Sequence, residues 1–153
     1  MSLEKDISQK EFRSGKQKAL INIIYTHHFL IGKMNEVFKS LRITRQQYNV
    51  LRILRGAHPE PVTVNLIKER MLDKMSDASR IVERLRVKGL LDRCQSKTDR
   101  RAVEILISQK GLDLLGKYDP GFKAFDHFFD DLSQPEIDHL NQILDKLRNS
   151  KSS

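Results

Sequence analysis

The apolar residues between Glu11 and Leu41 recur at alternating steps of four and three positions, which predicts one long helix. A second apolar row, formed by Ile23, Leu30 and Val37, widens the stripe beyond what one small neighbour would cover. Packing in a core would explain such a stripe, and its width also favours dimerisation. The main row consists of Leu20, Ile24, Ile31, Met34, Phe38 and Leu41, with His27 in its one gap.

Two shorter helices are predicted to follow the long one. Thr44 is a candidate N-cap for a helix that ends near Gly56, ahead of two prolines. After a short extended piece at Val62 and Thr63, the same Thr63 can cap a helix over Val64–Met71. Both helices are expected to pack one face on the core. The expected core residues are Tyr48, Leu51, Ile53 and Leu54 in the first helix and Leu66, Ile67 and Met71 in the second.

A fourth helix is predicted between Ser76, a candidate N-cap, and Gly89, where a left-handed C-terminal cap is expected. Its inner face consists of Ala78, Ile81, Val82 and Leu85, at helical spacing. Its outer face consists of Ser76, Ser79, Arg80, Glu83, Arg84 and Val87. Such a face can be a solvated surface or a binding surface, and the helix alone does not decide between them.

The period of the apolar residues changes from helical to extended after Gly89. Leu90–Cys94 and Ala102–Ile107 are predicted as the two strands of a β-hairpin. The polar loop between them has a basic tip, formed by Lys97, Arg100 and Arg101. Two short helices followed by a basic hairpin have the order of a winged helix-turn-helix, whose second helix enters the major groove of DNA.

The pattern therefore predicts double-stranded DNA as the partner of this segment. Arginine can donate two hydrogen bonds to guanine, and serine can bind phosphates or base edges. The hairpin tip, with Lys97, Arg100 and Arg101, can reach the DNA backbone or the minor groove. The candidates for the major groove point away from the inferred core and are Ser76, Ser79, Arg80 and Arg84.

The C-terminal part is predicted to be helical again. Leu112, Leu114 and Leu115 begin one helix, which Phe122, Phe125 and Phe129 continue beyond Pro120-Gly121, a pair expected to kink or break it. Ser133 to Glu136 forms a capping-box motif ahead of a last helix with Ile137, Leu140, Leu144 and Leu147 on one face. The expected fold is mainly α with a small β-hairpin. Its expected parts are an N-terminal dimerisation helix (1–43), a winged helix-turn-helix (44–110) and C-terminal dimerisation helices (111–153).

Charge supports this division of the chain. The 153 residues carry a formal net charge of +8, and the sequence pI is about 9.7, which favours a polyanionic partner. Residues 1–67 have a net charge of +6, residues 68–110 of +5 and residues 111–153 of −3. A basic body with an acidic end indicates a surface for phosphates and a separate end kept away from them.

Several short motifs of the hairpin region resemble the MarR family of bacterial transcription regulators. They are Leu85-x-x-x-Gly89-Leu90-Leu91-x-Arg93, Asp99-Arg100-Arg101-Ala102 and Leu106-Ile107-Ser108-x-x-Gly111, and the Asp-x-Arg of the wing is the most specific of them. The resemblance extends over nearly the whole chain. It implies an obligate homodimer that binds pseudo-palindromic DNA, usually as a repressor, and that often releases DNA on binding a small phenolic or other anionic ligand.

The resemblance also implies roles for single residues. Ser76, Ser79, Arg80 and Arg84 would enter the major groove, Arg100 or Arg101 the minor groove, and Asp99 would orient the wing by pairing with an arginine. Two features depart from the family pattern. Pro120-Gly121 falls inside a dimerisation helix, and the first helix lacks the cysteine of the family's thiol sensors. Cys94, on a wing strand, is interpreted as a small structural residue.

The sequence offers weaker candidates for a small-molecule site. His27 lies among the apolar residues of the long helix, where an interface role is expected, although a titrating imidazole can also bind an anion. Tyr48 is expected in the core and is the second candidate. No cofactor is expected.

The alternatives to DNA binding alone are a metal-responsive regulator, an enzyme and a protein-interaction scaffold. Five histidines raise the possibility of a metal-responsive regulator, but the sequence has no His-x-x-x-His motif and a single cysteine, so no metal site is expected. Because the sequence has no glycine-rich phosphate loop and no nucleophile motif, an enzyme is not expected. A protein-interaction scaffold that does not bind DNA remains the main alternative.

With no apolar run of about 20 residues and no signal peptide, the chain is expected to be cytoplasmic and away from membranes.

Overall fold

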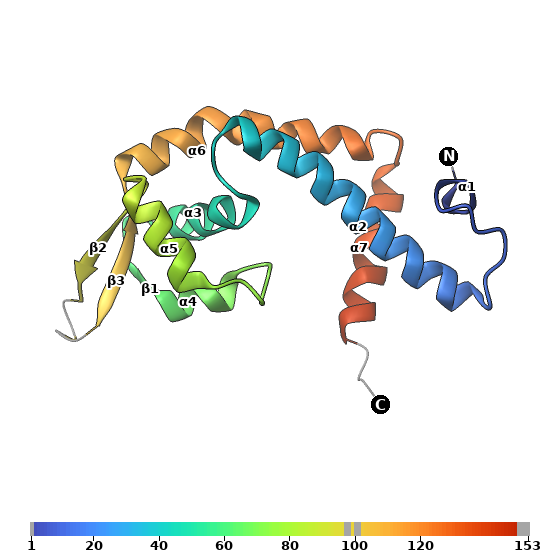
Figure 1. Cartoon of the computed structure of the whole chain (residues 1–153), viewed down its shortest axis with the longest axis horizontal. Helices are drawn as coiled ribbons and strands as arrows, with labels where there is room; N and C mark the ends of the chain where they lie inside the picture. Colours follow the sequence, from blue (N-terminus) through green and yellow to red (C-terminus); the bar gives the residue numbers. More distant parts are fainter. Residues whose placement is uncertain (1, 97–98, 100–101, 150–153) are drawn as a thin grey trace.

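The computed structural model describes residues 2–96, 99 and 102–149 and is mainly helical, with one small sheet (Figure 1). The elements are α1 (Leu3–Asp6), α2 (Gly15–Ser40), α3 (Arg45–Ala57), β1 (Val62–Thr63), α4 (Val64–Arg70), α5 (Ala78–Val87), β2 (Leu91–Gln95), β3 (Val103–Ile107), α6 (Gln109–Phe122), the 3-10 helix η1 (Lys123–Phe129) and α7 (Gln134–Asn149). Elements α3 to β3 gather at one end, here called the winged body, while α7 and the start of α2 lie at the other. No helix within the described ranges is long and apolar enough to cross a membrane.

The predicted long helix is present as α2, but it begins at Gly15 and not at Glu11. The backbone of Ser14 is extended, and its hydroxyl accepts a hydrogen bond from the amide of Gln17, which caps the helix there. The short helix α1 was not predicted, and its Glu4 pairs with Lys18 of α2 at 2.5 Å. Only the end of α2 enters the core, through the buried Phe38.

The predicted caps of α3 and α4 are confirmed. The Thr44 hydroxyl accepts a hydrogen bond from the amide of Gln47, and the Gln47 side chain accepts one from the amide of Thr44, which completes a capping box. Thr63 caps α4 by accepting from the amide of Leu66. The largest fully buried side chains of these two helices are Val50, Leu51, Leu54 and Ile67.

The fourth predicted helix is α5, with one correction at its start. The N-cap is Asp77 and not Ser76, because the Asp77 carboxylate accepts the amide hydrogen bond of Arg80 while Ser76 lies in the preceding turn. The end is as predicted: Gly89 has a φ of +70°, and the amide of Leu90 donates back to the carbonyl of Leu85. Ala78, Val82 and Leu85 are buried, so the opposite face of α5 is left outward.

The predicted hairpin is present as β2 and β3, and the sheet has a third strand. The extended piece Val62–Thr63 pairs antiparallel with β3, with Val62 opposite Ile105, so the strand order is β1-β3-β2. The extended piece was predicted but its partner strand was not, since pairing across more than 40 residues leaves no local signal. Ile105 and Leu91 are buried on the side of the sheet that faces the helices.

Of the kink or break expected at Pro120-Gly121, a break at the pair itself does not occur. Helix α6 continues through both residues to Phe122, and the chain then changes to the 3-10 helix η1. A proline removes one backbone hydrogen bond, which bends a helix without having to end it. The motif before α7 is confirmed in part: the Glu136 carboxylate accepts from both the amide and the hydroxyl of Ser133. These two bonds, the hydroxyl first, lower the pKa of Glu136.

Gly111 allows α6 to approach the end of α5 closely. A Cβ atom on Gly111 would lie 2.3 Å from the carbonyl oxygen of Leu90 and 2.8 Å from Cγ1 of Ile107. The same Leu90 carbonyl accepts the amide of Ser108, and the Ser108 hydroxyl donates to the carbonyl of Gly89 at 2.7 Å. The Ser108-x-x-Gly111 motif therefore joins the end of α5, the sheet and α6 at one point.

We expect Gly111→Ala to destabilise the fold, because backbone must move to admit the methyl group. The expected loss is about 1–3 kcal/mol in the free energy of unfolding, measured by urea denaturation. Gly116→Ala in the same helix is the matched control, since a Cβ there meets nothing within 4 Å. Alanine should leave stability unchanged or raise it at Gly116. Equal effects of the two substitutions would contradict the close-approach role of Gly111.

Candidate nucleic-acid interface

The outward face of α5 and the turn before it carry the residues that were predicted to enter the major groove. Ser79, Arg80 and Arg84 are exposed, and Ser76 is half-buried in the turn before the helix. In Figure 1, the start of α5 and the free ends of β2 and β3 point away from α6. One side of the winged body therefore presents both the start of the candidate recognition helix and the wing.

The turn that precedes α5 is fixed to α3 by hydrogen bonds. The amide of Leu72 donates to Oδ1 of Asn49 at 2.9 Å, across 23 residues of sequence. Within the turn, Asp73 accepts the amides of Met75, through its side chain, and of Ser76, through its carbonyl. The Met75 amide, followed by the Ser76 hydroxyl, lowers the pKa of Asp73. The start of α5 is thus positioned by polar groups that the sequence analysis did not single out.

Glu83 joins α5 to the wing. Its carboxylate accepts from Arg86 at 2.8 Å in the same helix and pairs with Arg93 of β2 at 2.9 Å. The hydrogen bond from Arg86, and then the positive charges of Arg86 and Arg93, lower the pKa of Glu83. The sequence placed Glu83 on the outer face, where a carboxylate would repel phosphate. In the structure, Glu83 also holds Arg93 of the wing strand β2.

The tip of the wing lies largely outside the described residues. This applies to Lys97, Arg100 and Arg101, so their predicted contacts stay predictions. At the edge of the tip, the amide of Asp99 donates to the Ser96 hydroxyl at 3.3 Å. The pairing of Asp99 with an arginine also stays a prediction.

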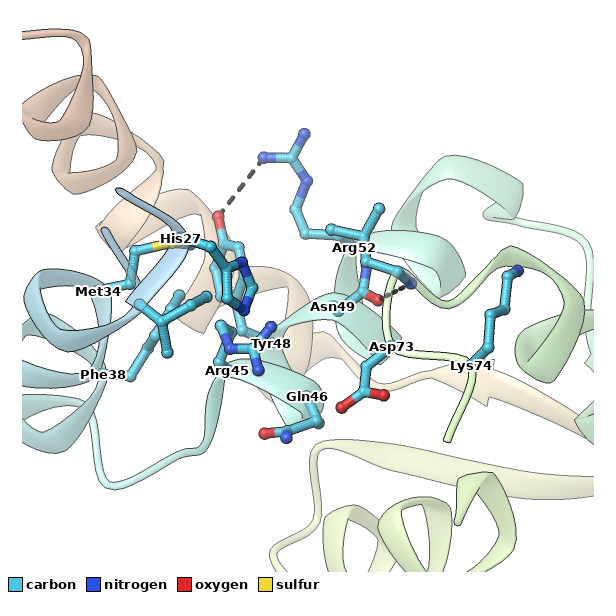
Figure 2. Close-up of a pocket in the computed structure, with 12 residues that line it drawn as sticks. His27, Met34, Phe38, Arg45, Gln46, Tyr48, Asn49, Arg52, Asp73 and Lys74 are labelled. Atoms are coloured by element: carbon cyan, nitrogen blue, oxygen red, sulfur yellow. Dashed lines mark hydrogen bonds between the residues drawn. The ribbon is translucent and has the colours of Figure 1, made fainter. Parts of the chain in front are cut away.

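A pocket of about 650 Å³ lies between α2, α3 and the turn that precedes α5 (Figure 2). It brings together both ligand candidates of the sequence analysis, His27 from α2 and Tyr48 from α3. Tyr48 is also a core residue, as expected, with 4% of its surface exposed and its ring 4.9 Å from that of Phe38. The full lining consists of His27, Ile31, Met34, Phe38, Arg45, Gln46, Tyr48, Asn49, Arg52, Leu72, Asp73 and Lys74.

The pocket combines an apolar wall with cationic side chains. Ile31, Met34 and Phe38 supply apolar surface from α2, while Arg45 and Arg52 come from α3. Arg52 donates to the Tyr48 hydroxyl at 3.4 Å, as Figure 2 shows. Neither arginine was predicted from the sequence as a ligand residue. Their positions, three and four residues on either side of Tyr48, place all three on one helical face, and that spacing was the available signal.

Neither histidines nor the cysteine assemble a metal centre in the part of the chain that the structure describes, where no group of three potential metal ligands occurs. Cys94 is half-buried on β2, and its thiol lies 3.6 Å from the Glu104 carbonyl, which accepts its weak hydrogen bond.

A second surface, at the other end of the molecule, is apolar. Five large side chains of α2 are between 39% and 59% exposed, and another group extends over η1, the following turn and α7. The two groups consist of Leu20, Ile23, Ile24, Tyr25 and Phe29, and of Phe129, Leu132, Leu140, Ile143 and Leu147. From the apolar rows predicted for the long helix, they include two residues of the main row and one of the second row, and from the stripe predicted for the last helix they include Leu140 and Leu147.

Comparisons with known proteins agree with this geometry. A model of the MarR family matches residues 43–102, from just before α3 to the residue before β3. No curated protein sequence gives a significant match. Among solved structures, a MarR transcription factor from Planctomyces limnophilus is 28% identical, with a TM-score of 0.65 over 88% of this chain and 98% of its own.

Two further solved structures share the fold at lower identity. Staphylococcus aureus MepR, in a complex with DNA, is 21% identical, with a TM-score of 0.75 over 90% of this chain and 99% of its own. Bordetella bronchiseptica BpsR, whose DNA binding is regulated by 6-hydroxynicotinic acid, is 20% identical, with a TM-score of 0.73 over 93% and 99% of the two chains. Family match, winged fold and sequence motifs together lead to one conclusion: residues 43–102 of this chain match the MarR family of transcription regulators, and nearly the whole chain has the fold of that family's solved structures.

Proposed function

We propose that this protein is a cytoplasmic homodimer that binds a pseudo-palindromic operator, represses transcription, and releases the DNA when a small anionic aromatic ligand binds. The observation that carries this proposal is that one short segment serves two sites. Leu72 and Asp73 line the pocket and also belong to the turn that positions α5. A ligand that moves this turn would therefore move the recognition helix.

Each protomer would bind DNA through α5 and the wing. Ser76, Ser79, Arg80 and Arg84 would enter the major groove, which is about 12 Å wide and accommodates one helix. Lys97, Arg100 and Arg101 would contact the backbone or the minor groove from the tip of the wing, with Asp99 orienting it. The DNA complex of MepR, which has the same fold, supports this mode of binding.

Dimerisation would cover the apolar side chains at the other end of the molecule. The exposed groups on α2 and α7 leave a surface that a monomer would present to water at a high cost. In the sequence-based division of the chain, they fall in the parts 1–43 and 111–153. A two-fold axis there would set two α5 helices at half-sites about 10 base pairs apart.

The effector would be an aromatic carboxylate or phenolate. An aromatic ring fits the apolar wall of Met34 and Phe38, and an anionic group fits Arg45 or Arg52, which also form part of the lining. The regulation of BpsR by 6-hydroxynicotinic acid supports this ligand class. Such a ligand weakens DNA binding only if it binds more tightly to the arrangement that does not fit the operator.

Substitutions at Arg84 and Arg101 test the proposed DNA contacts of α5 and the wing. Arg84→Ala should weaken binding to an operator selected from random duplexes by about tenfold or more and leave binding to unrelated duplexes nearly unchanged. Arg101→Ala should weaken both. Fluorescence anisotropy over a range of salt concentrations measures this, with Arg148→Ala on α7 as the control. If the wild type shows no salt-dependent binding to any duplex, the scaffold interpretation replaces this one.

A substitution of Glu83 changes operator affinity in opposite directions according to whether Glu83 repels DNA or positions the wing. Removing a carboxylate near phosphates should strengthen binding if Glu83 only repels DNA. Because Glu83 holds Arg93, we expect Glu83→Gln to weaken operator binding several-fold while binding to unrelated duplexes rises. Anisotropy at low and high salt separates the two effects, and stronger operator binding would contradict the positioning role.

The third prediction concerns the pocket. Calorimetry should detect binding of 6-hydroxynicotinate or salicylate, and Arg52→Ala should weaken it about tenfold or more, because a charge-assisted hydrogen bond is lost. The same variant should need correspondingly more ligand to release the operator. Lys33→Ala, which alters an exposed lysine of α2 outside the pocket lining, is the control. Operator binding that responds to neither acid would contradict this ligand class and leave the DNA-binding proposal standing.

A further inference from the structure

Met75 is the most exposed of the large apolar residues identified in the described part of the chain. It lies in the turn before α5, with 94% of its surface exposed. The apolar surface assigned to dimerisation lies on α2, η1 and α7, at the other end of the molecule. Burial against a second copy of the chain at that surface would leave Met75 exposed and available to a different partner.

The backbone around Met75 is held in place although its side chain is free of contacts with the core. The Met75 amide donates to the Asp73 carboxylate at 3.1 Å, and the amide of Ser76 donates to the Asp73 carbonyl. On the N-terminal side, the Leu72 amide is fixed to Asn49 of α3. The turn therefore displays an apolar side chain on an anchored backbone, which lowers the entropy lost on binding.

The charge and position of this turn favour DNA as the partner. Met75 lies two residues before Asp77, the N-cap of α5, and the first residues of a recognition helix are those that contact base edges. Lys74 and Arg80, on either side of it in sequence, are exposed and can pair with phosphates, while the carboxylates of Asp73 and Asp77 accept backbone amides of the turn and of α5. A neutral protein surface would gain nothing from these two cations.

We propose that Met75 is a specificity-determining residue that contacts the C5-methyl group of a thymine in each operator half-site. This inference rests on the proposed DNA-binding function. Met75 would recognise a base that the polar residues of α5 do not contact. In the major groove, the thymine methyl is the apolar feature of the base edges, and an apolar side chain recognises it by contact. A methionine side chain is unbranched and flexible, so it can follow a methyl group across the groove.

The experiment is a uracil scan of an operator selected with the wild-type protein. Each thymine of a half-site is replaced in turn by deoxyuridine, which keeps every hydrogen-bonding group and removes only the methyl. At one or two thymines, the wild type should lose about fourfold in affinity per half-site, the value for burying one methyl-sized group. Met75→Ala should bind the thymine and uracil duplexes at those positions equally, and Met75→Leu should keep the discrimination.

The control is Val87→Ala, which shortens an exposed apolar side chain at the far end of α5 and should leave the uracil effect intact. The inference is overturned if the wild type and Met75→Ala lose the same affinity at every thymine, or if the selected half-sites contain no preferred thymine. Either result leaves the DNA-binding proposal standing when the wild type binds its operator. If the wild type binds no duplex, both proposals fall.

Discussion

The hydrogen bond between the Leu72 amide and the Asn49 side chain ties the turn before α5 to α3. Both the proposed DNA binding by α5 and its proposed regulation by a ligand depend on this bond. A recognition helix must keep a fixed direction, because a small rotation at its start moves every side chain in the groove. The apolar face of α5 fixes its distance from the core. The bonds around Asn49 and Asp73 fix where it begins.

These bonds are few and lie at the surface, so each contributes modestly to stability. That weakness suits a regulator. An anchor made of buried aliphatic side chains would resist a ligand, whereas two or three exposed hydrogen bonds can be exchanged for contacts with a ligand in the adjoining pocket. The other end of α5 is held more firmly: Lys88 donates to the Arg42 carbonyl at 2.6 Å, and Gly111 packs against the Leu90 carbonyl. Unequal attachment would let α5 pivot about its C-terminal end.

Local chemistry explains which features could be predicted from the sequence. Thr44, Thr63 and Gly89 act within four residues of themselves, so caps and helix ends were visible in the pattern. Features that depend on distant partners were not. The pairing of Val62 with Ile105 and the contact of Glu83 with Arg93 join segments whose relative position only the fold determines. Ser76 was mistaken for the N-cap because Asp77 is an equally good cap one position later. His27 and Tyr48 were predicted as ligand candidates, but Arg45 and Arg52 were not, because nothing local in the sequence shows that α2 lies opposite them.

The separation of charge along the molecule affects how it meets DNA. Residues 1–110 carry all of the excess positive charge, whereas residues 111–153 are net negative. The excess positive charge is concentrated in the winged body, because residues 44–110 have a net charge of +7 and the rest of the chain together has +1, so the molecule has an electric dipole along its length. In the field of a duplex, this dipole would turn the winged body toward the phosphates before contact. Fewer collisions would then begin with the wrong end, and the benefit would fade as salt screens the field.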